Sequence, residues 1–373
     1  MDDKQIWDKI KKGVFIIAEA GKNFIQTEEE KTVEEYLENA KELVDKAALA
    51  GADAIKFQTH VVYDEQLSHI KVLAAHFKGL DRYSWSTRNM NATPAEDFWK
   101  PLKAHCEEKG VVFFSTPTGR EAAKRLSSVG VNLWKLASGD LLDFVLTDYL
   151  RNTNAPIIMS SGASTFEEVQ RVYNFLREKN KRVAVVHALS KYPGKPEEAN
   201  LAILELYRET FPEAPIGFSE NSVGIEPSCI AVALGATIVE KHFSIRRDLW
   251  GADHGVCSTP EEFKEMVDTI RNIENDAGEK NKWLHHPKCK EIMGEKKKEL
   301  LESEKEFRIV FQKVLRAGAD VKEGEVLTSD KIYAMRPRSK AKGLPSEEYE
   351  NVLGKKVKKA LKKYDPITED VVG

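Results

Sequence analysis

Eight short apolar runs in the first 242 residues each end in polar side chains able to take part in chemistry. The runs span residues 14–18, 54–57, 111–114, 133–136, 156–159, 183–186, 215–218 and 236–239. The polar residues that close or follow them are, in order, Glu19; Lys56 and Gln58; Ser115 and Thr116; Lys135 and Ser138; Ser160 and Ser161; His187; Ser219, Glu220 and Asn221; and Glu240, Lys241 and His242. In a parallel barrel the carboxyl ends of all strands lie on one face, where such barrels build their active sites. The series therefore predicts a polar site assembled from eight strand ends.

Two lysines, Lys56 and Lys135, stand among small hydroxyl side chains in this series. Two ammonium groups, several hydroxyls and loop N–H groups together suit a phosphate or a carboxylate. A buried lysine is costly unless a counter-charge lies nearby. The hydroxyl residues expected around the lysines are Ser115, Thr116, Ser138, Ser160 and Ser219. For any one serine, the alternative is that it only satisfies backbone groups at a strand end.

Glu19 and His242 close the first and the last run. Glu19 is a candidate general acid or base, or an anchor for substrate hydroxyls. His242 is a candidate ligand of a borderline metal, and its alternative is a packed, hydrogen-bonded histidine. The sequence has no GxxxxGK[ST] loop, no GxGxxG after a strand and no Gly-x-Ser-x-Gly. A P-loop site, a Rossmann dinucleotide site and a hydrolase triad therefore have no support.

Helical patterns separate the apolar runs and must position these side chains. The predicted helices cover 33–50, 93–110, 120–129, 165–179, 199–211, 225–234 and 260–275. The helix over 93–110 opens with Thr93-Pro94-Ala95-Glu96, which is typical of a capping box. A strand-then-helix order repeated eight times predicts an α/β fold, a (β/α)8 TIM barrel, with an open doubly wound sheet as the alternative. The long connection from Thr59 to Asn91 is typical of a functional lid.

Composition divides the chain into three parts. We assign a barrel to residues 1–275, a charged linker to 276–306 and a small, mostly β module to 307–373. The linker is rich in charge and nearly free of aliphatic runs, so we expect it to be solvated, with one exposed helix at most. A metal clip formed by three residues of the linker is the less favoured alternative. These residues are His285, His286 and Cys289.

The module that follows the linker has short β-like pieces at 309–314 and 332–335 and few helical patterns. Its basic run, GKKVKKALKKY at 354–364, is interpreted as a solvated surface. The alternatives are that it attracts an anionic substrate or pairs with the acidic barrel.

Charge and hydropathy argue against several classes of protein. The net formal charge is −3 in 373 residues, which is unlike a nucleic-acid-binding protein. No apolar run approaches the roughly 20 residues of a membrane span, and the first residues lack an apolar signal core. We therefore expect a cytoplasmic protein with no nucleic-acid and no membrane partner. The four scattered cysteines lack CxxC spacing and are expected to be reduced, structural thiols.

Nine ordered segments of the barrel carry a resemblance to a known family. They are FIIAEAGKN (15–23), GADAIKFQTH (51–60), FFSTP (113–117), WKLASGD (134–140), IIMSSGAS (157–164), VVHALSKYP (185–193), IGFSENSVGIE (216–226), ALGATIVEKHF (233–243) and GADHGVCSTPEEF (251–263). These segments look like the sialic acid (N-acylneuraminate) synthase family. The tail segments 317–337 and 349–372 resemble that family's antifreeze-like (SAF-type) domain. The resemblance covers nearly the whole chain except the first dozen residues and the linker.

The resemblance implies a barrel enzyme that condenses phosphoenolpyruvate with an N-acylated hexosamine-type aldose, similar to N-acetylmannosamine, and releases phosphate. The residues that match phosphoenolpyruvate ligands are Lys56, Thr116, Lys135, Ser138, Ser160 and Ser219. Gln58 matches a bridge between the two substrates, and Glu19, Tyr192 and Asp253 match contacts to the sugar. Arg336 matches an arginine that the SAF domain places in the partner subunit's site, which implies a domain-swapped homodimer. Within this set, the resemblance and the strand-end pattern make Glu19, Lys56 and His242 the candidate catalytic residues.

The chain departs from the family's pattern after the seventh run. It reads Ser219-Glu220-Asn221, where the family usually has Ser-Asp-His, whose histidine pairs with the counterpart of His242 to hold a divalent metal such as Mn²⁺. Even losses in the outer contacts of a metal site cost roughly 10–100-fold in affinity, so a lost ligand costs at least that. Three hypotheses stay open. Asn221 or Glu220 binds a harder ion such as Mg²⁺, the enzyme works without a metal, or catalysis is impaired.

A second departure lies in the loop after the sixth run. The chain reads His187-Ala188-Leu189-Ser190, where the family more often has Cys-Thr after the histidine and some members have Asn at the position of Ser190. Ser190 stays a candidate substrate contact, and the identity of the acyl sugar stays open. The alternatives are a pseudaminic- or legionaminic-type acid synthase, a synthase acting on a phosphorylated sugar, and a non-catalytic sugar-binding relative with an impaired metal site.

Overall fold

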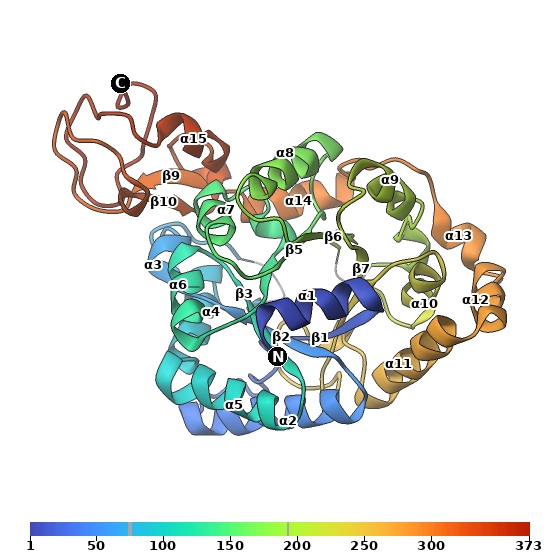
Figure 1. The fold of residues 1–373 in the computed structure, drawn as a ribbon. Coiled ribbons are helices and arrows are strands. Elements are labelled where there is room, and N and C mark those ends of the chain that lie inside the picture. Colours follow the sequence, from blue (N-terminus) through green and yellow to red (C-terminus); the bar gives the residue numbers. More distant parts are fainter. Residues whose placement is uncertain (74–76, 192–193) are drawn as a thin grey trace.

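The computed structural model describes residues 1–73, 77–191 and 194–373. Eight parallel strands lie at the centre of the molecule (Figure 1). They are β1 (Phe15–Gly21), β2 (Ala54–Thr59), β3 (Val112–Pro117), β4 (Trp134–Leu136), β5 (Ile157–Ser160), β6 (Val183–Ala188), β7 (Ile216–Glu220) and β8 (Ile238–His242). Because β1 pairs with both β2 and β8, the sheet curves into a barrel. The described residues form no hydrogen-bonded ladder between β3 and β4, so the barrel is nearly closed, and the predicted TIM-type fold is confirmed.

A ring of helices surrounds the strands, and one or more helices follow each strand. The helices of the ring are α2 (Val33–Leu49), α5 (Lys100–Glu108), α6 (Arg120–Val129), α7 (Phe144–Arg151), α8 (Phe166–Arg177), α9 (Ile203–Thr210), α10 (Glu226–Ala233) and α11 (Pro260–Asn275). Two more helices, α3 (Val62–Glu65) and α4 (Arg82–Ala92), occupy the long connection after β2. The capping box predicted before α5 is wrong: Pro94 occupies the cap of a π-helical turn, and the Thr93 hydroxyl donates to the Asn89 carbonyl oxygen at 2.8 Å.

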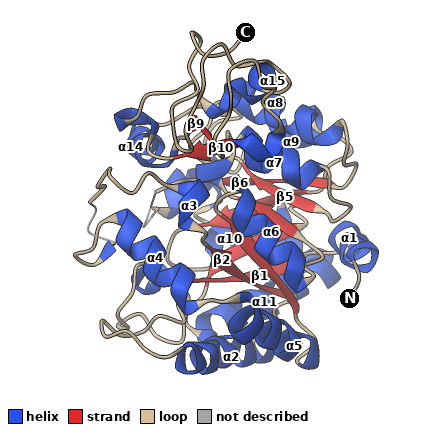
Figure 2. Ribbon diagram, turned by 90° about the vertical axis from the view of Figure 1, so that its left-hand side faces the viewer, coloured by secondary structure: helices blue, strands red, loops and turns tan. Residues whose placement is uncertain are grey.

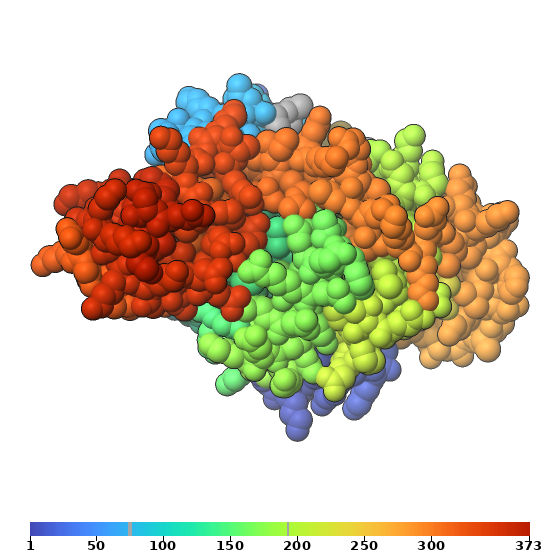
Figure 3. Space-filling view, turned by 90° about the horizontal axis from the view of Figure 1, so that it is seen from above, coloured from blue at the N-terminus to red at the C-terminus, as the bar shows by residue number. Residues whose placement is uncertain are grey.

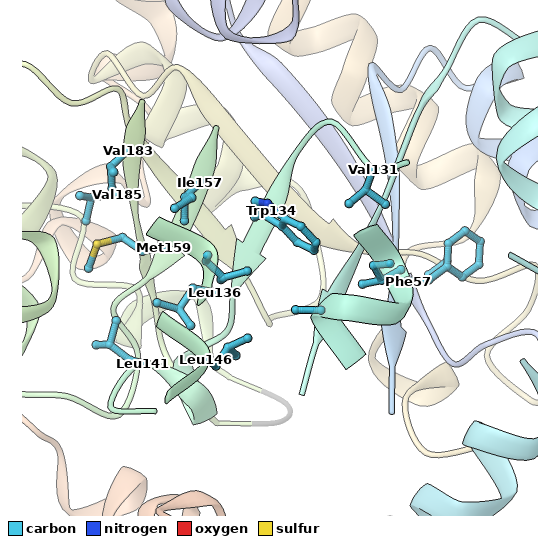
Figure 4. Close-up of a cluster of buried hydrophobic side chains, with 14 of the residues drawn as sticks. Phe57, Val131, Trp134, Leu136, Leu141, Leu146, Ile157, Met159, Val183 and Val185 are labelled. Carbon is cyan, nitrogen blue, oxygen red and sulfur yellow. The ribbon is translucent and has the colours of Figure 1, made fainter. Parts of the chain in front are cut away.

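Alternate residues of each strand face two different cores. Residues such as Ile17, Ala54 and Ile238 belong to a cluster inside the barrel. Their neighbours along the chain belong to the larger cluster between the strands and the helices. Figure 4 shows part of this outer cluster, with Trp134 and Met159 among the side chains that pack there. Both faces of every strand are therefore buried, as is usual in parallel sheets.

A helix that the sequence patterns did not predict closes one end of the barrel. Helix α1 (Asp3–Lys12) is capped by a reciprocal pair of hydrogen bonds between Asp2 and Gln5. Its residues Ile6, Trp7 and Ile10 join the cluster inside the barrel. In Figure 2, α1 lies at one end of the barrel and α4 and α14 (Glu302–Phe311) lie at the other. Polar ligands therefore have to enter from the end opposite α1.

The predicted linker is folded against the barrel. It contains α12 (Ala277–Leu284), α13 (Cys289–Met293) and the start of α14, which crosses the expected boundary after residue 306. Figure 3 shows this orange segment running over the barrel toward the C-terminal module. Ile292, Lys298 and Glu304 are buried, so the expectation of a fully solvated linker is wrong for these residues. The sequence did not reveal this because their partners come from distant loops.

The C-terminal module contains an antiparallel pair, β9 (Val314–Ala317) and β10 (Ile332–Met335), and a short helix, α15 (Tyr349–Val352). The strand at 332–335 is confirmed, whereas residues 309–311 of the other predicted piece belong to α14. The module joins the loop after β2: Arg336 N donates to the Glu65 carbonyl oxygen at 2.9 Å, and Leu67 N donates to that of Arg336 at 3.0 Å. These bonds fix β10 at the mouth of the barrel.

Other expectations concern cysteines and membrane segments. All four cysteines are free thiols. None of the helices in the described parts of the chain combines the length and apolar character needed to cross a membrane.

The histidines of the predicted metal clip have other partners. His285 contacts the Asn281 carbonyl oxygen, and His286 stacks on the Trp283 ring. No group of three metal-ligating histidine, cysteine or acidic residues forms within the described ranges.

Candidate active site

A cavity of about 290 Å³ opens at the carboxyl ends of the strands. It brings together almost all of the side chains that the sequence singled out for the site. Those that line it are Glu19, Lys56, Gln58, Thr116, Lys135, Ser138, Ser160, Ser219, Asn221, His242, Asp253 and Arg336. Ser190 lies behind this lining, and Tyr192 is outside the described residues.

The alternation of the strands divides the polar strand ends into two sets. Lys56, Lys135 and His242 lie two or four positions after residues of the cluster inside the barrel. Their side chains therefore point to the inside of the barrel, and they line the cavity. The other set takes the outward parity and lies behind the strands; it comprises Ser115, Ser161, His187, Glu220 and Lys241. Ser115 pairs with the Thr59 hydroxyl at 2.8 Å, so its predicted place in the anion pocket is wrong.

His187 is a packed histidine of the outer layer. Its Nε2 lies 2.7 Å from the Ala199 carbonyl oxygen, and its ring packs near those of Tyr207 and Phe218. Burial, together with the charge of Lys298, lowers its pKa to about 3. This histidine is therefore neutral and serves the packing of α9 against the barrel.

The two cavity lysines are paired with carboxylates. Lys56 forms an ion pair with Glu19, its Nζ lies 3.7 Å from Glu240 Oε1, and it donates to Thr116 Oγ1 at 3.1 Å. Lys135 Nζ lies 3.3 Å from the same Glu240 oxygen. These carboxylates supply the counter-charge that buried lysines require.

Glu240 is a residue of the site that the sequence analysis named at the eighth strand end but gave no role. It lies two positions before His242 on β8, so its parity alone identifies it as an inward residue. It also accepts a hydrogen bond from Ser219 Oγ at 3.1 Å. Burial acts to raise its pKa, but the charges of Lys135 and Lys56 outweigh burial and lower the pKa to about 2. Glu240 is therefore ionised.

Burial and neighbouring charges shift the pKa values of the two lysines in opposite directions. Burial acts to lower the pKa of Lys56, but Glu19 and Glu240 together raise it above its ordinary value. Burial lowers the pKa of Lys135, and Glu240 only partly opposes this because Lys56 repels the second charge. An added anion would relieve this repulsion, so the pair of lysines is suited to binding one.

A second group of polar side chains lies beside the lysines. Gln58 Nε2 donates to Glu19 Oε1 at 3.0 Å, and Lys22 Nζ donates to Gln58 Oε1 at 2.6 Å. Lys22 Nζ also lies 3.7 Å from Asp253 Oδ2. A side chain at Gly21, which has φ +52°, would begin 3.2 Å from Glu19 Oε1 and 3.5 Å from Asp253 Oδ2. Glycine thus allows these two carboxylates to approach the chain where β1 ends.

Arg336 enters the cavity from the C-terminal module of the same chain. It forms an ion pair with Asp140, and its Nη1 lies 4.0 Å from Glu65 Oε1. Its guanidinium also lies over the Phe311 ring, 5.2 Å from the centroid. The expectation that Arg336 reaches a partner's site therefore differs from this structure, in which it completes the cavity of its own barrel.

Helix α14 adds an aromatic wall that the sequence analysis missed. Phe307 and Phe311 stack with their ring centroids 4.1 Å apart, and both line the cavity. Arg82 lies over the Phe311 ring at 4.9 Å and donates to Glu65 Oε1 at 2.9 Å. The spacing of four residues between the phenylalanines was the available signal.

The cavity lacks the pair of imidazoles that the resemblance implies for a metal site, because Asn221 lines it beside His242. Asn221 Nδ2 donates to the Leu189 carbonyl oxygen at 2.6 Å. Glu220 faces away from the cavity, where it lies 3.2 Å from Lys241 Nζ and accepts hydrogen bonds from Ser222 and Ser228. The described residues contain no group of three histidine, cysteine or acidic ligands. Burial lowers the pKa of His242, although the charges of Glu19 and Asp253 oppose this shift.

Together, the fold and the cavity define a (β/α)8-barrel protein with a paired-lysine site at the carboxyl ends of its strands. Two family models match the chain: the NeuB family over residues 43–282 and the SAF domain over residues 312–372. The chain belongs to the NeuB family and carries a C-terminal SAF domain.

The named relatives cover nearly the whole chain. The spore coat polysaccharide biosynthesis protein SpsE of Bacillus subtilis is 35% identical over 90% of this chain and 87% of its own length. Its crystal structure has a TM-score of 0.74, covering 97% of this chain and 95% of that one. The human N-acetylneuraminate-9-phosphate synthase is 28% identical over 96% of this chain and 92% of its own. The N,N'-diacetyllegionaminic acid synthase of Campylobacter jejuni is 28% identical over 96% of this chain and 100% of its own.

Proposed function

We propose that this chain condenses phosphoenolpyruvate with an N-acylated hexosamine-type aldose, similar to N-acetylmannosamine, and water to give a nine-carbon sialic-acid-type sugar and phosphate. The observation that carries the proposal is the pair Lys56 and Lys135 at the barrel mouth, sharing Glu240 and surrounded by hydroxyl groups. Membership of a family whose named members include synthases of such sugars supports it.

Phosphoenolpyruvate is the anion in this proposal. Its phosphate and carboxylate compete with Glu19 and Glu240 for the two ammonium groups. The hydroxyls of Thr116, Ser138, Ser160 and Ser219 donate to the remaining oxygens. Because Lys135 is the less well compensated lysine, we assign it the larger share of the binding.

The reaction forms one C–C bond and breaks one C–O bond. The methylene carbon of phosphoenolpyruvate attacks the aldehyde carbon, and the aldehyde oxygen takes up a proton. Water adds to the cationic carbon that bears the phosphate and loses one proton. The new hydroxyl then gives its second proton to the departing phosphate as the C–O bond to phosphate breaks, which leaves the keto acid. We assign the proton transfers to the Glu19–Lys56 ion pair, which Gln58 holds by a hydrogen bond to Glu19. Glu19, Gln58 and Asp253 then contact the sugar.

The deciding experiment is an incubation of the protein with phosphoenolpyruvate and a panel of N-acyl and di-N-acyl hexosamines, with and without a phosphate group. Phosphate release is followed for each sugar. The sugar with the highest kcat/KM separates the sialic, legionaminic and pseudaminic alternatives. Release with none of the sugars would overturn the proposal in favour of a non-catalytic sugar-binding protein.

The role of a metal is a separate question. We derive no step through a bound ion, and the three hypotheses stay open: a harder ion held through oxygen, catalysis without a metal, and impaired catalysis. Turnover is measured after exhaustive chelation and again after adding Mn²⁺ or Mg²⁺. Full activity in the chelator contradicts a metal requirement, and activity restored by one ion identifies it.

The domain-swapped homodimer also stays a prediction from the resemblance. It is tested by coexpressing a Lys135→Ala chain with an Arg336→Ala chain under two affinity tags. If the modules are exchanged between subunits, one site in each mixed dimer is wild type and activity returns. If Arg336 acts within its own chain, as in the cavity described above, no activity returns.

A further inference from the structure

Glu304 lies in the segment expected to be a solvated linker, yet it is 1% exposed. Its Oε1 accepts hydrogen bonds from Ala163 N at 2.8 Å and from Ser190 N at 2.9 Å. Its Oε2 accepts a hydrogen bond from Leu301 N at 3.3 Å. One carboxylate oxygen therefore ties the loop after β5 to the loop after β6.

The two loops meet at Gly162. A Cβ at this position would lie 2.4 Å from Ser190 Oγ and 2.6 Å from Ser138 Oγ, which leaves no room for a methyl group. Ser138 Oγ in turn donates to Ser160 Oγ at 3.0 Å, and both serines line the cavity. Because this contact is so close, a shift of either loop moves the serines assigned to phosphoenolpyruvate.

The surroundings of Glu304 carry more energetic cost than is needed only to attach helix α14 to the barrel. Ala163, whose N–H it accepts, has a left-handed backbone with φ +51°, which side-chain-bearing residues rarely adopt. The nearest cation is the buried Lys298, whose Nζ lies 4.0 Å away. Helix α14 already has an anchor, because Arg308 forms two hydrogen bonds of 2.8 Å with Glu168 on α8. A buried carboxylate held mainly by loop N–H groups points to control of the loops.

We propose that Glu304 is a positioning residue, which holds the loops after β5 and β6 so that Ser138 and Ser160 keep their places at the cavity, with Ser190 packed behind them. This inference rests on the proposed function for its readout in turnover. It also explains why α14 belongs to the active site: Glu304, Phe307 and Phe311 follow one another at spacings of three and four residues, so one face of the helix supplies both the carboxylate and the aromatic wall.

The test compares Glu304→Ala and Glu304→Gln with Glu302→Ala, a change at an exposed residue of the same helix. Glu304→Ala should lower kcat/KM by about 10- to 100-fold, as expected for the loss of hydrogen bonds to a buried charged group, and should raise KM for phosphoenolpyruvate. Glu304→Gln should recover most of this loss, because its amide oxygen can still accept from both N–H groups. Glu302→Ala should match the wild type.

A double variant separates positioning from a general loss of stability. Glu304 does not contact Ser138 directly, so independent roles would make the effects of Glu304→Ala and Ser138→Ala multiply. We expect the double variant to lose much less than the product. Multiplying effects, or a Glu304→Ala protein with a lower melting temperature but wild-type kcat and KM, would overturn the inference.

Binding of phosphoenolpyruvate by calorimetry keeps the inference separate from the proposed function. If no sugar supports turnover but the wild type binds phosphoenolpyruvate, a weaker affinity in Glu304→Ala than in Glu302→Ala still supports positioning. Equal affinity in the two variants refutes it. If the wild type neither binds phosphoenolpyruvate nor turns over, the proposed function and this inference are both wrong.

Discussion

Two buried groups of lysine and glutamate meet on consecutive residues of β8. On the inner side, Glu240 lies 3.3 Å from Lys135 and 3.7 Å from Lys56. On the outer side, Lys241 lies 3.2 Å from Glu220 and donates to the Ser222 carbonyl oxygen at 2.8 Å. The two groups have the same chemistry and similar burial, but only the first borders the cavity.

The two groups differ in whether a lysine can replace its carboxylate partner with a bound anion. The outer pair is enclosed between β7, β8 and α10, and the hydroxyls of Ser222 and Ser228 complete it. A change there leaves an uncompensated charge in the interior, which is strongly destabilising. The inner lysines can replace a carboxylate partner with a bound anion. The position of a strand residue relative to the cavity therefore decides whether an ion pair serves stability or binding.

The largest expected effect comes from Lys135→Met, which removes the ammonium group and keeps the length of the side chain. Glu240 retains Lys56 as a partner, so we expect the fold to survive. Phosphate release should fall by about 10²–10³-fold or more, the loss typical of removing a charge-stabilising donor from an active site. Calorimetry with phosphoenolpyruvate provides the check, and wild-type affinity would refute the placement of the anion pocket.

The matched change on the outer side is Lys241→Met. Glu220 then stays buried without its cation, and we expect the free energy of unfolding to fall by about 3 kcal/mol or more. Below the unfolding temperature, kcat/KM should stay within about twofold of the wild type, because the side chain does not border the cavity. Urea denaturation followed by an activity assay measures both. A stable but inactive Lys241→Met protein would contradict the comparison.

The sequence predicted where the strands end, but it did not predict which residues face the inside of the barrel and which face the helices. Apolar runs ending in polar residues located the barrel mouth and most of the cavity lining. Because both faces of a parallel strand are buried, hydrophobicity does not distinguish inward from outward residues. His187 and Ser115 were therefore named in the same series of strand ends as Lys56, although they face the outer layer.

The remaining gaps come from contacts between distant parts of the chain. Glu304 stands in a charged stretch, and nothing local distinguishes it from the exposed Glu302. Its partners Ala163 and Ser190 are more than 100 positions away. Helix α1 was missed for the same reason, since its apolar face has meaning only once the barrel interior exists.

A smaller effect is expected from Asn221→His, which places an imidazole on the cavity side of β7. The introduced ring can keep the hydrogen bond to the Leu189 carbonyl oxygen through one nitrogen. Its other nitrogen then joins His242 as a second imidazole ligand for a metal. We expect Mn²⁺ to bind about 10–100-fold more tightly than to the wild type, as measured by calorimetry. Adding His242→Ala to this variant should remove the gain, and equal Mn²⁺ affinity before and after Asn221→His would show that position 221 does not face a metal site.

The smallest effect is expected at Asp64. Glu240 and Glu220 are buried beside lysines, whereas the charges around Asp64 do not offset the cost of burying its carboxylate. It accepts a hydrogen bond from Glu121 N at 2.9 Å, and burial, only partly opposed by this bond, Lys313 and Arg120, raises its pKa to about 7. Since the folded pKa lies above the ordinary value of 3.8, the folded state takes up a proton that the unfolded chain lacks between these values. The contribution of Asp64 to stability is therefore lost as the pH rises toward and through 7.

The Asp64→Asn variant tests this pH dependence. The asparagine cannot ionise and keeps an oxygen that accepts from Glu121 N. The melting temperature of the variant should therefore exceed that of the wild type by about 2 °C or more at pH 8.5, and by less at pH 5. A difference that is the same at both pH values would show that Asp64 is compensated after all, like the lysine-paired glutamates on β7 and β8.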